Sequence, residues 1–152
     1  MNRKFYLYLL LFSVFIISCQ EKNNQNSEED LVLATLHKFE ESILNNDKDL
    51  ASKLLTDSAE ILEYGDIENK DEYLSEHFFY DGRFLEAMNT EIESRKIKIN
   101  NSVSWVSTKS NMTGNYNGVD QNLNFIELII LEKKEEDWKI SAIHWSSSSN
   151  DN

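Results

Sequence analysis

The second half of the chain is a succession of β-rich segments that follow one another closely. Five segments are rich in β-branched and aromatic residues and are separated by short polar stretches: residues 91–99, 102–108, 112–116, 123–133 and 138–147. A parallel pair of strands needs a crossover of a dozen or more residues, which these gaps do not provide. The five segments therefore predict an antiparallel meander, in which the first two segments could also form one long strand with a bulge.

The first half of the chain is predicted to be helical. Between Asp30 and Asn45 most apolar residues recur at spacings of three and four: Leu31, Leu33, Ala34, Leu36, Phe39, Ile43 and Leu44. Asp47 suits the N-cap of a second, short helix. Residues 59–64 are typical of a strand, and residues 69–89 return to a helical pattern. Each element has one apolar side to bury, so we expect an α+β fold with a curved antiparallel sheet packed against three N-terminal helices.

The N-terminus resembles a bacterial lipoprotein signal. Arg3 and Lys4 precede an apolar run over residues 5–17, and Ser18-Cys19 ends it like a lipobox. The resemblance implies that residues 1–18 are removed and that the Cys19 thiol carries lipid. The alternative is an ordinary cysteine at the end of a cleaved signal or an anchor helix. The residue after the cysteine is not an acidic inner-membrane retention signal, which favours the outer membrane of a bacterial cell envelope over the inner one.

The remaining chain divides simply. Residues 19–28 hold no apolar side chain after the cysteine and are predicted to be a disordered tether, residues 29–148 have the length of one domain, and residues 149–152 form a tail. A single cysteine allows no internal disulfide and no cysteine metal site. Loss of Arg3 and Lys4 moves the net charge from −12 to −14. Such a surface repels phosphates, so we expect no nucleic-acid partner and membrane contact through the lipid anchor only.

Three stretches of the domain resemble a known superfamily. These are the helix over residues 72–78 with Asp81 just beyond it, the strand Val103 to Ser107, and above all the segment Trp138 to Ser147. They resemble the nuclear-transport-factor-2-like superfamily, most closely its SnoaL-like subset, over residues 30–147. The resemblance implies a cone whose mouth opens on a pocket, and a homodimer through the open face of the sheet. Members include isomerases, dehydratases and cyclases.

Strand alternation suggests which side chains face such a pocket. In the last strand Trp138, Ile140, Ala142 and His144 are predicted to share one face unless a bulge intervenes. His144 is a candidate general acid or base, or a histidine hydrogen-bonded in the sheet. In the preceding strand Glu127 shares an apolar face, where it is either a cavity carboxyl with a raised pKa or a strand-end group that reaches water.

His77 and Asp81 are a second candidate pair. They are four residues apart, which places them on one face of a continuous helix, an arrangement that resembles dehydratase and isomerase members of the superfamily. The alternative is that Asp81-Gly82 forms a turn and ends the helix. His37 is expected to be solvated. Three histidines scattered over positions 37, 77 and 144 show no ligand spacing, so the sequence predicts neither a metal nor a cofactor.

The expected function follows from the pocket. Five aromatic residues are candidates for stacking a flat apolar ligand, although core packing would explain them equally well: Tyr64, Trp105, Tyr116, Phe125 and Trp145. Phosphate-binding loops and Gly-x-Ser-x-Gly elbows are absent. We therefore expect a lipid-anchored envelope domain that binds a small, partly apolar molecule or a protein partner. The alternative is an isomerase, dehydratase or cyclase that uses a pocket His, Asp or Glu.

Overall fold

The computed structural model describes the chain from Gln20 to Asn150, and its side chains from Glu28 onward. The predicted signal, residues 1–18, and the predicted lipidation site Cys19 lie outside the described residues. Within the part of the chain that is described, no helix combines the length and the apolar character that crossing a membrane requires.

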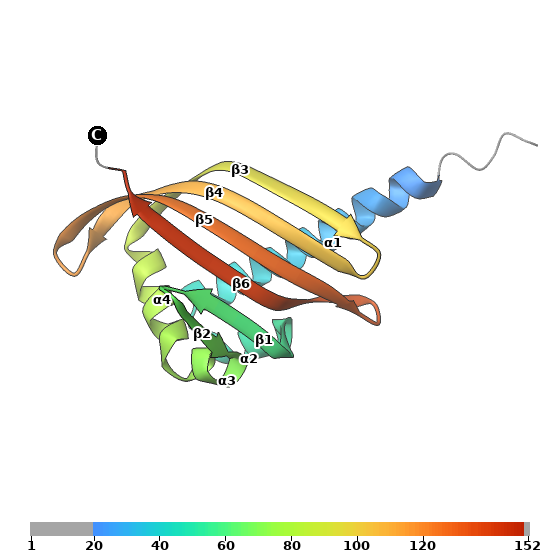
Figure 1. The fold of residues 1–152 in the computed structure, drawn as a ribbon, viewed down its shortest axis with the longest axis horizontal. Helices are drawn as coiled ribbons and strands as arrows, with labels where there is room; N and C mark the ends of the chain where they lie inside the picture. Colours follow the sequence, from blue (N-terminus) through green and yellow to red (C-terminus); the bar gives the residue numbers. More distant parts are fainter. Residues whose placement is uncertain (1–19, 151–152) are drawn as a thin grey trace, which may run out of the picture.

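A single six-stranded sheet dominates the structure (Figure 1). Its strands are β1 (Leu55–Glu63), β2 (Asp66–Asn69), β3 (Met88–Asn100), β4 (Val103–Tyr116), β5 (Val119–Lys134) and β6 (Asp137–Ser149), in the order β2-β1-β6-β5-β4-β3. Strands β3 to β6 form the predicted antiparallel meander. Strand β1 pairs with β6 in parallel, so the sheet is mixed and the prediction of a wholly antiparallel sheet is wrong. The long chain between β1 and β6 supplies the crossover that a parallel pair needs.

The predicted division of the meander also needs correction. Strands β3 and β4 are separate, joined by a turn at Asn101-Ser102, so the first two predicted segments are not one bulged strand. The predicted segments 102–108 and 112–116 instead form the single strand β4. The polar residues between them are typical of a turn, yet they continue the ladder, with Lys109 opposite Ile126 and Asn111 opposite Asn124. Tertiary pairing here overrides local propensity.

The helices lie together on one face of the sheet (Figure 1). Helix α1 spans Gln20–Leu44 and α2 spans Lys48–Leu54, where the Asp47 side chain accepts a hydrogen bond from the Leu50 amide at 2.9 Å as an N-cap. The third helical run is continuous and consists of α3 (Lys70–Glu72), the π-helical turn η1 (Tyr73–His77) and α4 (Phe78–Glu86). The α+β architecture of three helical units on a curved sheet agrees with the prediction.

Gly82 does not end the third helical run. A Cβ atom at this position would lie 2.6 Å from the main-chain oxygen of Ile43 in α1. The glycine is therefore present because α4 and α1 approach each other closely, and not because the chain turns. The prediction of a turn at Asp81-Gly82 is wrong for this reason.

Helix α1 differs from its prediction at both its start and its buried face. It begins at Gln20 and so includes residues 20–28, for which the sequence predicts a disordered tether. From residue 28 onward it is held against the sheet, because the Glu28 carboxylate accepts hydrogen bonds from Trp138 Nε1 at 2.9 Å and Lys133 Nζ at 2.6 Å. The buried stripe consists of Val32, Leu36, Phe39 and Ile43. The predicted members Leu31 and Leu44 are exposed instead.

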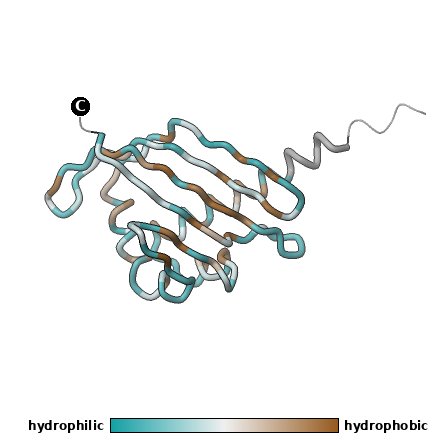
Figure 2. Tube along the Cα trace, in the orientation of Figure 1, coloured by the Kyte–Doolittle hydropathy of each residue, from teal (hydrophilic) through white to brown (hydrophobic). Residues whose placement is uncertain are grey.

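A β-bulge in β6 decides which residues of that strand face the helices. Ile140 lies opposite Leu131 and Ala142 lies opposite Ile130, which leaves Ser141 without a partner in the ladder. The extra residue reverses the alternation, so the buried side chains of β6 are Trp138, Ile140, Ile143 and Trp145. The predicted face that included His144 is therefore wrong beyond the bulge. In Figure 2 hydrophobic positions follow the central strands, whereas the hairpin ends are hydrophilic.

Candidate functional site

A cavity of about 710 Å³ lies between the helices and the inner face of the sheet. Its walls come from α1, the end of β1, the η1–α4 run and strands β3 to β6. Most of the wall is apolar, with side chains such as Phe39, Ile43, Met112 and Phe125. Polar residues also line it, and two places in the wall hold hydrogen-bonded acidic side chains, one at the helical run and one on the inner face of β5.

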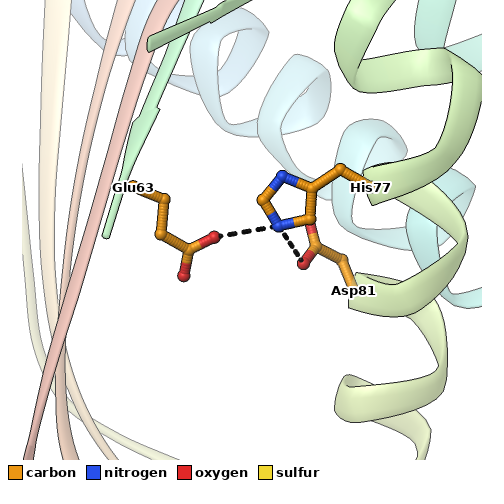
Figure 3. Close-up of side chains that lie close together, drawn as sticks. All are labelled: Glu63, His77 and Asp81. Atoms are coloured by element: carbon orange, nitrogen blue, oxygen red, sulfur yellow. Dashed lines mark ion pairs between the residues drawn. The ribbon is translucent and has the colours of Figure 1, made fainter. Parts of the chain in front are cut away.

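The first place is a group of three carboxylates around one histidine, which we call the histidine cluster: Glu63, Glu68, His77 and Asp81. Glu63 ends β1, Glu68 lies in β2, His77 ends the π-helical turn, and Asp81 lies one turn later in α4. His77 Nε2 lies 3.2 Å from Glu63 Oε2 and 3.3 Å from Asp81 Oδ1 (Figure 3). On the other side of the ring Nδ1 donates to Glu68 Oε2 at 2.5 Å. The imidazole is thus surrounded by carboxylates.

Tyr73 fixes one member of the histidine cluster. Its side chain is completely buried, and its hydroxyl donates a hydrogen bond to Asp81 Oδ2 at 2.9 Å. Burial, reinforced by the negative charge of Asp81, raises the pKa of the Tyr73 hydroxyl well above its usual range. Tyr73 therefore remains a proton donor to this carboxylate at any physiological pH, and it leaves Oδ1 of Asp81 directed toward His77.

The carboxylates keep His77 protonated. Close contact with the carboxylate of Asp81, then with that of Glu63, raises the pKa of His77 from 6.5 to about 11, against the opposing effect of burial. At neutral pH the side chain is an imidazolium with carboxylates on both edges. Spacing along the helix predicted that His77 and Asp81 share one face, and the structure brings them together.

Sequence reasoning missed the other two carboxylates of the histidine cluster. Glu63 and Glu68 reach His77 only because β1 and β2 form a hairpin through Tyr64-Gly65, with Glu63 opposite Asp66. A strand ended by Gly65-Asp66 is visible in the sequence. Nothing in the spacing, however, indicates that this hairpin packs beside the third helical run.

The second polar place is centred on Glu127. Its carboxylate accepts a hydrogen bond from Trp145 Nε1 at 2.9 Å, and it faces the cavity from the inner face of β5. Burial is the main cause that raises the pKa of Glu127 above its usual range. Of the two alternatives that the sequence left open, a cavity carboxyl with a raised pKa therefore agrees with the structure. Nearby, Arg95 is paired with Glu40 at 2.7 Å and donates to Thr108 at 3.1 Å.

The candidate aromatic residues divide between the cavity and the outside. Tyr116, Phe125 and Trp145 line the cavity. Tyr116 packs edge-to-face on Phe84, with ring centroids 5.3 Å apart. Tyr64 is a rim residue, with 85% of its surface exposed. It adopts a left-handed backbone conformation, φ 51°, which is unusual for a bulky side chain.

Trp105 and His144, two of the candidate residues, are not among those that line the cavity. Trp105 is on the outer face of the sheet with Lys98 Nζ 5.8 Å from its ring, because Ser104 and Val106 are the inward residues of β4. His144 is exposed because of the bulge in β6. An exposed tryptophan on the outer face is compatible with a homodimer through the sheet, which stays a prediction. His37 is exposed as expected and contacts Glu40 at 3.1 Å.

Among the described residues one group offers three convergent metal-ligand atoms. Glu63, His77 and Asp81 each bring a donor atom within 4.8 Å of the other two. The sequence predicted no metal because its three histidines are scattered, and only the fold brings one of them to two carboxylates. Chemically the cavity therefore combines an imidazolium with carboxylate partners and a separate carboxyl that retains its proton to higher pH than usual.

Solved structures resemble this architecture over most of its length. A candidate ketosteroid isomerase from Shewanella frigidimarina superimposes with a TM-score of 0.71 and 23% identity, covering 74% of this chain and 92% of that one. A candidate scytalone dehydratase from Novosphingobium aromaticivorans gives 0.68 with 12% identity, covering 84% and 88%. An NTF2-like protein from Cytophaga hutchinsonii gives 0.62 with 18% identity, covering 79% and 98%.

These likenesses establish the fold, which is that of the nuclear-transport-factor-2-like proteins, as the sequence resemblance predicted. Solved structures of this fold include a candidate ketosteroid isomerase and two candidate dehydratases, and a shared fold alone does not assign a function. No protein-family model matches the sequence, and no curated protein sequence matches it either.

Proposed function

We propose that the domain binds a small, partly apolar molecule in its cavity. The observation that carries this proposal is a cavity of about 710 Å³ with mainly apolar walls and a smaller polar part that includes the histidine cluster and Glu127. Small-molecule sites typically enclose about 300–1,000 Å³ and use a few polar groups to orient the ligand. The volume and the distribution of polar groups both suit such a ligand.

The charges of the cavity restrict the ligand's chemistry. Its wall includes the carboxylates of Glu40, Glu63 and Asp81 and the carboxyl of Glu127, whereas its cations, His77 and Arg95, are already paired with carboxylates. An anionic ligand would find no free positive partner there. The ligand is therefore a neutral or cationic molecule with an apolar body and a group that hydrogen-bonds to Glu127.

The proposal places this domain on a bacterial envelope membrane as a lipoprotein. The apolar run over residues 5–17, its basic start and the Ser18-Cys19 ending support this location. A Cys19→Ser variant is expected to lose the lipid and appear in the aqueous fraction of disrupted cells, whereas wild type stays with the membranes. Wild type in the aqueous fraction at full length would contradict the anchor.

A second candidate function is proton transfer on a bound substrate, of the isomerase, dehydratase or cyclase kind. The raised pKa of Glu127 supports this candidate, because a general acid or base works best when its pKa lies near the ambient pH. His77, with a pKa of about 11, is a poor proton donor at neutral pH. In an enzyme of this type Glu127 would therefore move the proton, and His77 would position Asp81 and Glu63.

Ligand binding is testable with a neutral fluorescent probe, N-phenylnaphthylamine, and two matched variants. Tyr116→Ala removes an aromatic ring from the cavity wall, and Trp105→Ala removes one from the outer face. We expect Tyr116→Ala to weaken binding by about tenfold, the equivalent of about 1.4 kcal/mol, and Trp105→Ala to leave it unchanged. Equal affinity of wild type and both variants would show that the probe binds elsewhere.

Native mass spectrometry of the purified full chain separates the two candidates further. A bound molecule that remains unchanged after incubation with the protein supports binding alone. Conversion of that molecule by wild type, lost in Glu127→Gln, would instead establish the proton-transfer function.

A further inference from the structure

The histidine cluster carries more negative charge than the protein neutralises. Glu63, Glu68 and Asp81 surround one imidazole, and among the described residues none of the three forms an ion pair with a lysine or arginine. All three side chains are partly buried, with 12%, 31% and 19% of their surfaces exposed. Burying three carboxylates beside a single cation is costly, and a divalent cation would balance them.

We propose that Glu63 Oε2, His77 Nε2 and Asp81 Oδ1 bind a first-row transition-metal dication, with Zn²⁺ as the probe, and that the metal takes the place of the Nε2 proton, which is released to solvent. The distances of 3.2 Å and 3.3 Å from Nε2 to the two oxygens carry this proposal. Zinc binds histidine nitrogen and carboxylate oxygen at about 2.0–2.2 Å, so the ligands of a tetrahedral site lie about 3.3–3.6 Å apart. The two observed distances lie within about 0.1 Å of the lower end of this range, and the third pair of donor atoms lies within 4.8 Å.

Among the described residues the two carboxylate oxygens contact no charged group other than His77. Glu63 Oε2 is buried and accepts no hydrogen bond of proper geometry, although it is close to Nε2. Oδ1 of Asp81 likewise has only the contact with Nε2, because Tyr73 binds the other oxygen. An orphaned buried oxygen is rare in proteins and indicates a missing partner.

Two neighbouring residues form hydrogen bonds with the atoms of His77 and Asp81 that would not bind the metal, namely Nδ1 and Oδ2. Glu68 accepts a hydrogen bond from His77 Nδ1, which fixes the ring so that Nε2 faces the two oxygens. Tyr73 donates to Oδ2 of Asp81 and fixes the carboxylate plane. Hydrogen-bonded outer partners of this kind accompany nearly all metal-ligating histidines and carboxylates. The cluster thus has the outer contacts of a metal site as well as its ligands.

The donor set also selects the kind of metal. An imidazole nitrogen with two carboxylate oxygens suits Zn²⁺, Fe²⁺ or Mn²⁺, whereas Ca²⁺ and Mg²⁺ prefer oxygen alone. Three protein ligands leave a fourth position open, as in catalytic rather than structural zinc sites. Since all three ligands line the cavity, that position adjoins the cavity space.

The test uses the full chain, stripped with a chelator and titrated with Zn²⁺ by calorimetry in the absence of any organic molecule. The proposal goes beyond ligand binding, so its failure leaves the proposed function standing. We expect one Zn²⁺ per chain. Asp81→Asn and Glu63→Gln should each weaken binding by more than about 100-fold, and the outer variants Glu68→Gln and Tyr73→Phe by about 10- to 100-fold.

Two variants serve as controls. His144→Gln removes a histidine from the outer face, and Cys19→Ser removes the one thiol of the chain. Neither should change the affinity. Failure of wild type to bind Zn²⁺, or binding that survives both Asp81→Asn and Glu63→Gln, would overturn the site. If those variants do not fold, the visible absorption of wild type loaded with Co²⁺ decides: an intense tetrahedral spectrum supports the site, and a weak octahedral one overturns it.

Discussion

The two polar places of the cavity differ in how their buried carboxyl groups are stabilised. In the histidine cluster a cation is shared between Glu63, Glu68 and Asp81, and the pKa of His77 rises to about 11. Glu127 instead faces an indole N–H and no cation in direct contact, and burial raises its pKa. The first arrangement keeps charge in the wall, whereas the second favours a neutral carboxyl. The cavity therefore has one ionic end and one end suited to hydrogen bonding.

The largest difference between the two ends is expected in protein stability, when His77 or Glu127 is replaced by glutamine. His77→Gln removes the only cation of its cluster and leaves three carboxylates facing one another. Breaking a fully buried ion pair costs about 3–5 kcal/mol, and we expect a loss of about 2 kcal/mol because 27% of the His77 side chain is exposed. Glu127→Gln keeps the shape and should change the free energy of unfolding by less than about 0.5 kcal/mol at neutral pH. Chemical denaturation of both variants measures this, and equal losses would contradict the comparison.

Helix packing offers a way to disturb the ionic end alone. Gly82→Ala places a methyl group 2.6 Å from the Ile43 carbonyl oxygen, so α4 must move away from α1 and carry Asp81 with it. Overpacking costs about 1–3 kcal/mol, and the better helix propensity of alanine returns about 1, so a net loss of about 1 kcal/mol is expected. Denaturation measures the loss, and the NMR signals of the His77 ring should shift while the Trp145 indole signal stays in place. An unaffected His77 would mean that α4 does not position the cluster.

The pH dependence of stability in the metal-free protein should show two contributions that begin at different pH values. Both groups bind their proton more tightly when folded, so each stabilises the fold at low pH and loses that contribution as pH rises through its folded pKa. For Glu127 the loss begins above pH 4.5, the ordinary pKa of a glutamate, whereas for His77 it begins above pH 6.5 and is complete only near pH 11. Glu127→Gln should flatten the stability curve in the acidic window and His77→Gln in the alkaline window. Thermal unfolding at a series of pH values measures the stability curve of each variant. A single variant that flattened the curve in both pH ranges would contradict the assignment of one range to each residue.

The smallest expected change in stability concerns Tyr64, at the rim of the cavity. Tyr64 adopts a left-handed conformation that asparagine tolerates better, so Tyr64→Asn should stabilise the domain by about 0.5 kcal/mol. The same variant should weaken probe binding, because the ring lies at the mouth of the cavity. Glu135→Asn is the matched control, since it relieves a left-handed residue, φ 57°, in the distant β5–β6 turn. Stabilisation by Tyr64→Asn without any loss of binding would exclude the ring from the site.

Sequence reasoning succeeded where the signal is local. The closely spaced strands β3 to β6 predict an antiparallel meander, and the spacing of His77 and Asp81 predicts a shared helix face. It failed where a distant contact decides the outcome. Gly82 looks like a turn residue until α1 is seen against it.

The bulge in β6 is a second feature that the sequence pattern does not predict. One unpaired residue, Ser141, exchanges the faces of His144 and Trp145, and nothing in the alternating pattern places it. The cluster partners of His77 depend in turn on where the β1–β2 hairpin packs. These features come from tertiary packing, which local periodicity does not encode.

The three tryptophan indoles give the most direct test of the cavity as the binding site. Trp145 donates to Glu127 in the cavity, Trp138 donates to Glu28 at the start of the domain, and Trp105 lies on the outer face. In a proton–nitrogen NMR spectrum each indole N–H gives its own signal. Titration with N-phenylnaphthylamine should shift the Trp145 signal and leave the other two in place. A shift of Trp105 with an unchanged Trp145 would contradict the account.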